Sequence, residues 1–199
     1  QPNAVKVFRG RTDGARTAGV HTHTAESRDF LWNGQLVTCC LLEEREFEGG
    51  ELVEISRSYL AQADDGAVYM FAEISQQFEE GVSVGFEGSW VVGGPSAPED
   101  PPDAFAVENP PMFMPVNLEV GDEFVPEDTD DEDEVIIILQ VGDTIRVPAG
   151  RFTNAIKMQE TNAESTELLW IVPGLGVVKI KEKGGREVLM ATTQQPVEL

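Results

Sequence analysis

Apolar residues recur through the first half of the chain, and tight-turn dipeptides separate the apolar segments at regular intervals. The dipeptides are Asn33-Gly34, Gly49-Gly50, Asp65-Gly66 and Glu80-Gly81, at spacings of 16, 16 and 15 residues. Glycine-bearing dipeptides of this kind favour two-residue hairpins, and the residues between them have the length of long strands. The pattern therefore predicts an antiparallel meander with strands over 17–32, 35–48, 51–64, 67–79 and 82–92.

Ideal hairpin registers place apolar side chains on both faces of this meander. Phe30, Cys39 and Phe71 fall on one face, and Leu36, Cys40 and Tyr59 fall on the other. A sheet with two partly apolar faces needs cover on both, and twist accumulates along strands of this length. We expect a long-stranded meander that curls into a half-barrel or forms a two-layer sandwich.

The second half begins with a proline-rich segment, residues 93–115, in which seven prolines deny the backbone donors that a regular sheet needs. Its apolar residues predict a long loop that crosses the sheet. Strands are predicted to resume over 135–141, 144–147, 155–160, 167–172, 176–182 and 186–192, with a hairpin at Gly184-Gly185. No segment has a convincing helical pattern, so residues 1–199 are expected to form a single all-β domain.

Charge is distributed unevenly along the chain. The formal net charge is −22, and residues 51–140 contain 22 acidic residues against the single base Arg57. Such a region repels nucleic acid and attracts cations or the basic surface of another protein. No apolar run approaches the roughly 20 residues of a membrane-spanning helix, so no transmembrane segment is expected.

The chain begins with Gln1 rather than methionine. It is therefore interpreted as the mature form of an exported protein, although a cloned fragment would look the same. The two cysteines, Cys39 and Cys40, are adjacent, and neighbours in a strand point to opposite faces, which makes a disulfide between them geometrically poor.

Several motifs occur together in a characteristic order. They include Gly50-Glu51-Leu52-Val53-Glu54, the stretch from Asp65-Gly66 to Glu73, Gly88-Ser89-Trp90, Val147-Pro148-Ala149-Gly150 and Val172-Pro173-Gly174. Over about residues 35–192 the chain resembles a largely uncharacterised family of exported bacterial β-rich proteins. The resemblance implies an extracytoplasmic location (periplasm, cell surface or secreted) and no established reaction or cofactor.

The two histidines of the chain, His21 and His23, share one face of a predicted strand. Counting back from the Asn33-Gly34 turn places His23 opposite Glu44 and His21 opposite Glu46. Two imidazoles and two carboxylates can hold zinc or another divalent metal. The alternative is a set of exposed cross-strand His–Glu pairs.

Residues 127–134 form an acidic run that is predicted to be a loop. Carboxylate oxygens of Asp128, Asp130, Asp131, Asp133 and Glu134 suit Ca²⁺, although the EF-hand pattern is missing. Ca²⁺ is thus the one cofactor considered, with a solvated loop as the alternative.

Two apolar segments are candidates for contact with other subunits. The N-terminal strand, residues 1–10, contains Val5, Val7 and Phe8, and it can pair with its own sheet or add to the edge of another subunit. The proline-rich loop contributes a second apolar set: Phe105, Met112, Phe113 and Met114.

No nucleophile, phosphate-binding or metalloprotease motif is found in the sequence. The leading hypothesis is a non-enzymatic binding or structural protein of the bacterial envelope or exterior. It would be a subunit of a larger protein assembly, either an accessory subunit or a filament subunit. One alternative is a carrier of an apolar small molecule in a half-barrel pocket. The other is a metal-dependent enzyme that uses His21 and His23.

Overall fold

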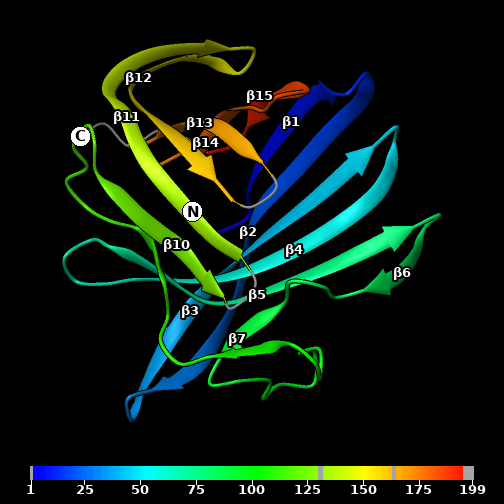
Figure 1. The fold of residues 1–199 in the computed structure, drawn as a ribbon, viewed down its shortest axis with the longest axis vertical. Helices are drawn as coiled ribbons and strands as arrows, with labels where there is room; N and C mark the ends of the chain where they lie inside the picture. The colour runs from blue at the N-terminus through cyan, green and yellow to red at the C-terminus, as the bar shows by residue number, and fades with distance from the viewer. Residues whose placement is uncertain (1, 130–131, 163–164, 195–199) are drawn as a thin grey trace.

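The computed structural model describes residues 2–129, 132–162 and 165–194, and within them it contains strands and no helix (Figure 1). The predicted all-β class is confirmed. The strands of the first half are β1 (Ala4–Thr12), β2 (Ala15–Trp32), β3 (Gln35–Glu48), β4 (Glu51–Gln62), β5 (Val68–Glu79), β6 (Val82–Gly85) and β7 (Trp90–Val92). Those of the second half are β8 (Phe105–Val107), β9 (Met112–Met114), β10 (Glu123–Thr129), β11 (Glu132–Val147), β12 (Gly150–Thr161), β13 (Thr166–Val172), β14 (Gly176–Lys181) and β15 (Gly185–Thr192).

All fifteen strands belong to one curled sheet that does not close. Its order is β10-β11-β12-β13-β14-β15-β1-β2-β3-β4-β5-β7-β8, and β6 and β9 also pair with β5. Every pairing is antiparallel except β7 with β8. In Figure 1 the C-terminal strands curve over the N-terminal ones. The meander is thus confirmed, and the pairing of β1 with β15 joins the two ends of the chain in the middle of the sheet.

The predicted turns form where glycine supplies a positive φ. Asn33 and Gly34 both have positive φ (51° and 76°), as the two-residue hairpin between β2 and β3 requires. The Asp65-Gly66 turn differs, because residues 63–67 form a longer connection closed by a hydrogen bond from the Ala63 N–H to the Ala67 carbonyl. The strand predicted over 82–92 is also wrong in extent, since it divides into β6 and β7.

Bulges displace the register from the ideal one. A bulge between Glu46 and Phe47 shifts β3 against β4 by one residue, so Tyr59 lies opposite Leu41 rather than Cys40. Tyr59 therefore joins the face of Phe30, and its ring packs edge-on against the Phe30 ring with centroids 5.7 Å apart. A one-residue slip exchanges faces, and an extra residue also bends the strand. The predicted position of Tyr59 on the opposite face is wrong for this reason.

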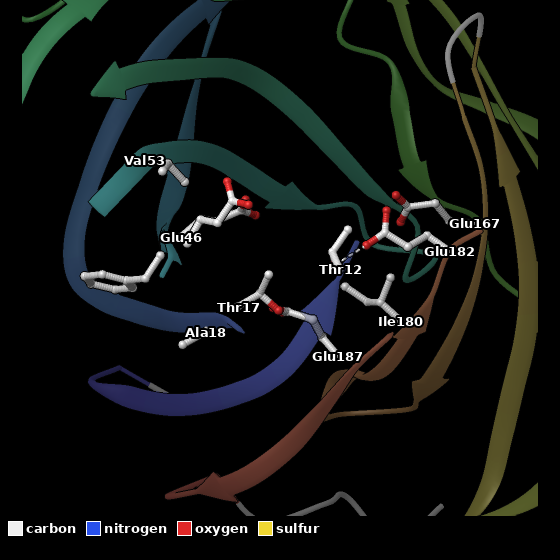
Figure 2. Close-up of a pocket in the computed structure, with 11 residues that line it drawn as sticks. Thr12, Thr17, Ala18, Glu46, Val53, Glu167, Ile180, Glu182 and Glu187 are labelled. Carbon is white, nitrogen blue, oxygen red and sulfur yellow. Dashed lines mark hydrogen bonds between the residues drawn. The ribbon is translucent and has the colours of Figure 1, made fainter. Parts of the chain in front are cut away.

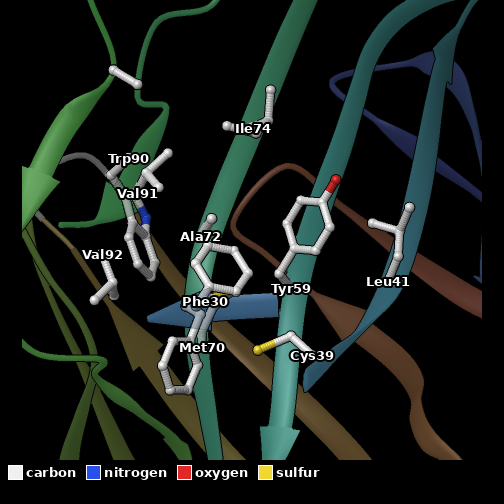
Figure 3. Close-up of a cluster of buried hydrophobic side chains, with 12 residues drawn as sticks. Phe30, Cys39, Leu41, Tyr59, Met70, Ala72, Ile74, Trp90, Val91 and Val92 are labelled. Carbon is white, nitrogen blue, oxygen red and sulfur yellow. The ribbon is translucent and has the colours of Figure 1, made fainter. Parts of the chain in front are cut away.

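The two faces of the sheet bury separate cores. The inner face, which carries Phe8 and Leu189, curls around the clusters that the C-terminal strands contribute. The outer face, which carries Phe30 and Cys39, buries a third cluster (Figure 3). This cluster lies at the end of β2–β5 that is next to the β2–β3 turn. Each large buried side chain contributes about 1.5–3 kcal/mol of hydrophobic stabilisation. The expectation that both faces are covered is confirmed.

Residues 93–115, named here the Pro-rich cover, lie over the outer-face core. Ala104, Val107 and Phe113 pack against that core. The cover is not all loop, because it contains β8 and β9, and β9 pairs with β5. Met114 in β9 packs against the cluster of Ile138 and Met158, so the cover connects one end of the sheet with the other. The prediction that this segment crosses the sheet is confirmed.

Candidate functional site

The histidine pair lies on the inner face, but in a different register from the predicted one. His21 pairs with Glu44 and His23 with Leu42, because a bulge between His23 and Ser27 adds residues to β2. The predicted pairing of His21 with Glu46 and of His23 with Glu44 is therefore wrong. His21 Nδ1 lies 2.5 Å from Glu44 Oε1, which makes this a close ion-paired contact when the imidazole is protonated.

A buried lysine occupies the neighbourhood of this pair. Lys6 on β1 lies opposite His21 and is 4% exposed. Burial lowers the pKa of Lys6, while the charge of Glu44 acts in the opposite direction. Burial would raise the pKa of Glu44, but His21, and then Lys6, bring it below its ordinary value. The positive charge of Lys6 therefore compensates the negative charge of Glu44 within this cluster.

Metal binding gains no support from this geometry. Across the described ranges, no three His, Cys, Asp or Glu side chains gather as a ligand set. A zinc site needs about four such ligands around one point, and the ammonium group of Lys6 repels a cation from the His21–Glu44 pair. The predicted set of His21, His23, Glu44 and Glu46 thus stays a prediction without structural support.

The acidic run does not form the predicted loop. Its residues continue strands β10 and β11, in which Glu127 lies opposite Glu134 and Asp128 opposite Asp133. Residues 130 and 131 lie outside the described residues, as do the side chains of 127–133. The Ca²⁺ prediction therefore cannot be followed into the structure.

A pocket of about 310 Å³ opens on the inner face between β3–β4 and β13–β15 (Figure 2). We name it the acidic pocket, because glutamates from several strands point into it. Its lining consists of Thr12, Thr17, Ala18, Glu46, Phe47, Glu48, Val53, Glu167, Ile180, Glu182 and Glu187. The side chain of Thr12 donates a hydrogen bond of 2.5 Å to Glu182.

Burial, and then the charges of neighbouring carboxylates, raise the pKa of Glu46 and Glu167 in the acidic pocket. Loss of contact with bulk water, followed by the charges of Glu54 and Glu44, raises the pKa of Glu46 to about 7. Burial and the charge of Glu182 raise the pKa of Glu167 as well. An apolar cargo would leave these polar groups desolvated and unpaired, which is costly. The pocket therefore does not favour the carrier of an apolar molecule.

The N-terminal strand is not available to another subunit. Strand β1 pairs with β15 on one side and with β2 on the other, so both of its edges are used. Phe8 is fully buried in the inner core, and Val5 and Val7 are half-buried. Pairing of this strand with its own sheet is confirmed, and the alternative, in which it adds to the edge of another subunit, is wrong for that reason.

The Pro-rich cover keeps part of its predicted apolar surface. Phe105 is 44% exposed and Met112 is 36% exposed, whereas Phe113 and Met114 pack against the chain's own cores. Exposed acidic residues stand beside Phe105 in sequence, at Asp103 and Glu108. Phe105 is therefore an exposed aromatic residue with exposed acidic residues close to it in the sequence.

A second charged surface lies on the outer face of β14, β15, β1 and β2. We name it the basic face, and it consists of Arg9, Arg11, Arg16, Lys179, Lys181 and Arg186. Cross-strand pairing aligns Lys181 with Arg186, Arg186 with Arg11, and Arg11 with Arg16. Directly opposed residues share one face of a sheet. Four cations therefore stand in one row across four strands.

Strand alternation places this row away from the inner core. Val178 and Ile180 point inward, so Lys179 and Lys181 point outward. Likewise Phe8 and Thr12 point inward, so Arg9 and Arg11 point outward. In the described part of the chain, Arg28, Arg45 and Arg57 form ion pairs with carboxylates, and none of the basic-face side chains does.

Trp170 borders the basic face on the side of β12 and is half-buried against the inner core. It lies opposite Lys157 on one side and Lys179 on the other. The ammonium of Lys179 stands 4.0 Å from the Trp170 ring centroid and that of Lys157 stands 5.4 Å from it. Burial, and then the charges of Arg186 and Lys181, lower the pKa of Lys179.

Sequence analysis missed the basic face because its members are far apart in the chain. The signal that was present is alternation: Arg9 with Arg11 and Lys179 with Lys181 each occupy positions i and i+2 of a strand. Finding the face also required the pairing of β1 with β15, which joins residues about 180 positions apart.

In comparisons with known proteins, no family model, no curated protein and no solved structure matches this chain. The resemblance to exported bacterial β-rich proteins thus stays a prediction. Among the residues that the structure describes, no helix has the length and apolar character needed to cross a membrane.

Proposed function

We propose that this chain is a non-enzymatic binding or structural protein of the bacterial envelope or exterior. It serves as a subunit of a larger protein assembly and contacts an acidic protein surface through its basic face. The observation that carries this proposal is the row of Lys181, Arg186, Arg11 and Arg16 on the outside of a chain whose net charge is −22.

Holding several like charges side by side on one face costs free energy. Neighbouring cations repel one another and destabilise the strands that hold them. A complementary acidic surface would remove that repulsion, accelerate the encounter and set the orientation of the complex. Because the strands hold these side chains in rows, the partner would meet a charge pattern already formed before docking.

The extracytoplasmic location in this proposal rests on the motif resemblance, and the non-enzymatic role rests on the sequence motifs described above. The structure adds one consideration. The basic side chains are on a regular sheet face rather than in a cleft, and a flat face suits contact with a protein surface better than enclosure of a small substrate.

The proposal is tested by gel filtration of undenatured extract from cells that produce the tagged chain. We expect the wild type to elute with a large assembly, and K181E/R186E to move toward the monomer position. R146E/R151E makes the same change in net charge on the β11–β12 hairpin and should elute with the wild type. Monomeric wild type, or equal behaviour of both variants, would contradict the proposal.

A further inference from the structure

We infer that the acidic surface bound by the basic face belongs to a second copy of this chain, at Asp103, Phe105 and Glu108 of the Pro-rich cover. This inference rests on the proposed function and names its partner. The contact joins two different surfaces, so each copy offers its basic face to one neighbour and its Pro-rich cover to another.

Charge complementarity favours a second copy. Between residues 51 and 126 the chain contains fifteen acidic residues and one base, Arg57. That base donates a hydrogen bond of 3.2 Å to Glu43, so it already has a carboxylate partner. A second copy of the chain therefore offers acidic side chains that can pair with the cations of the basic face.

The Pro-rich cover is suited to be the acceptor because it is both exposed and fixed. The side chains of Glu99, Asp103 and Glu108 are exposed. Between them Asp100 is buried and receives two hydrogen bonds from Arg28, of 2.6 and 2.8 Å. A surface held in place before docking loses little conformational entropy when it binds.

The two surfaces also match in their apolar parts. Beside the basic face, the half-buried Trp170 stands between Lys157 and Lys179 and also packs against the inner core. On the cover Phe105 stands between Asp103 and Glu108 in the sequence and is 44% exposed. Protein interfaces typically combine an aromatic centre with a charged rim. Each surface provides the rim charge that the other requires.

A nucleic acid or an anionic membrane fits the basic face less well. Both carry negative charge along their whole length, so they also meet the chain's acidic residues wherever these lie within the screening length of about 8–10 Å around the contact. A second copy is also negative overall, but at physiological salt charges more than about 8–10 Å apart are screened. The local match between cations and carboxylates then decides the contact.

Sedimentation equilibrium of the purified chain tests this inference. The wild type should self-associate at about 0.15 M salt, and 1 M salt should weaken the association at least tenfold. K181E/R186E should weaken it at least tenfold at the lower salt, whereas R146E/R151E, of equal charge change, should leave it unchanged within about twofold.

The acceptor is tested in the same way with D103K/E108K. This variant should also weaken self-association at least tenfold, and E79K/E87K, which alters two exposed acids outside the cover, should not. An equimolar mixture of K181E/R186E and D103K/E108K should associate again, because one partner retains the basic face and the other retains the cover.

Three results would overturn the inference. They are a monomeric wild type at every salt concentration, equal behaviour of surface and control variants, or binding of duplex DNA or anionic vesicles through the basic face without self-association. If the purified chain is monomeric while the assembly in cell extract still depends on Lys181 and Arg186, the second copy is excluded and the proposed function stands. If the chain is monomeric both after purification and in cell extract, the inference and the proposed function are both wrong.

Discussion

Arg28 on β2 and Asp100 in the Pro-rich cover form a two-pronged ion pair, in which Nη1 and Nη2 of Arg28 donate to the two carboxylate oxygens. Asp100 also accepts hydrogen bonds of 2.8 Å from the backbone N–H groups of Ser96 and Ala97. The Arg28 guanidinium stacks on Phe30 and Tyr59 in turn. One buried carboxylate therefore fastens the cover to the outer-face core.

Removal of this carboxylate should destabilise the fold. The Asp100→Ala variant leaves the Arg28 guanidinium and two backbone donors without their partner, and the expected loss is about 3 kcal/mol of unfolding free energy. Asp29→Ala, which removes the exposed hydrogen bond from Thr38, should cost less than about 1 kcal/mol. Urea denaturation measures both, and equal losses would show that the cover is not fastened there.

Stability should fall as the pH rises through the neutral range. The pKa of Glu46 is raised to about 7 in the fold, from an ordinary value of 4.5. Between these values the folded chain holds a proton that the unfolded chain has lost, so this contribution is present below pH 4.5 and lost as the pH rises through 7.

Glu46→Gln isolates that contribution. The variant should be more stable than the wild type at pH 8, by about 1 kcal/mol because water in the pocket screens the repulsion, and the difference should vanish near pH 5. Glu79→Gln removes an exposed carboxylate elsewhere and is the control for net charge. Urea denaturation at the two pH values checks this, and a constant difference would refute the shifted pKa.

The two adjacent thiols should differ sharply in reactivity. Cys39 is fully buried, and burial, followed by the charge of Cys40, raises its pKa to about 12, whereas Cys40 is exposed. The thiolate is the reactive form. One thiol per folded chain should react with a thiol reagent at pH 8, and mass spectrometry should locate it at Cys40. Reaction of Cys39 at a similar rate would mean that the outer-face core is open.

Truncation of two consecutive residues on β2 should change the free energy of unfolding by very different amounts. Phe30 is buried in the outer-face core, and Leu31 is 71% exposed. Phe30→Ala should cost about 3–5 kcal/mol of unfolding free energy. Leu31→Ala should change it by no more than about 0.5 kcal/mol. Thermal and chemical unfolding measure the contrast, and a comparable loss at both positions would exclude the face assignment.

The hairpins could be predicted from the sequence because their cause is local. Asn33-Gly34 has the positive φ that its turn needs, whatever lies elsewhere in the chain. Registers farther from a turn could not be predicted. The bulge between His23 and Ser27 moved His21 from Glu46 to Glu44, and no local signal marks it. The same is true of the bulge that moved Tyr59 to the other face.

The candidate surfaces depend on contacts between distant parts of the chain. Glu46 and Glu167 meet in the acidic pocket only because the sheet curls. Arg11 and Arg186 share a row only because β1 pairs with β15. The hydrophobic pattern of residues 4–8 predicts a strand but does not specify which edge it pairs with. Charge and alternation can therefore suggest members of a surface without assembling it.

Zero-length carbodiimide cross-linking of the native assembly tests the central claim most directly, because it joins a lysine to a carboxylate only when the two are in contact. We expect Lys179 or Lys181 to be joined to an aspartate or glutamate of another chain, and we expect this product to be lost at 1 M salt. Intact native material in which these two lysines form links only within their own chain would contradict it.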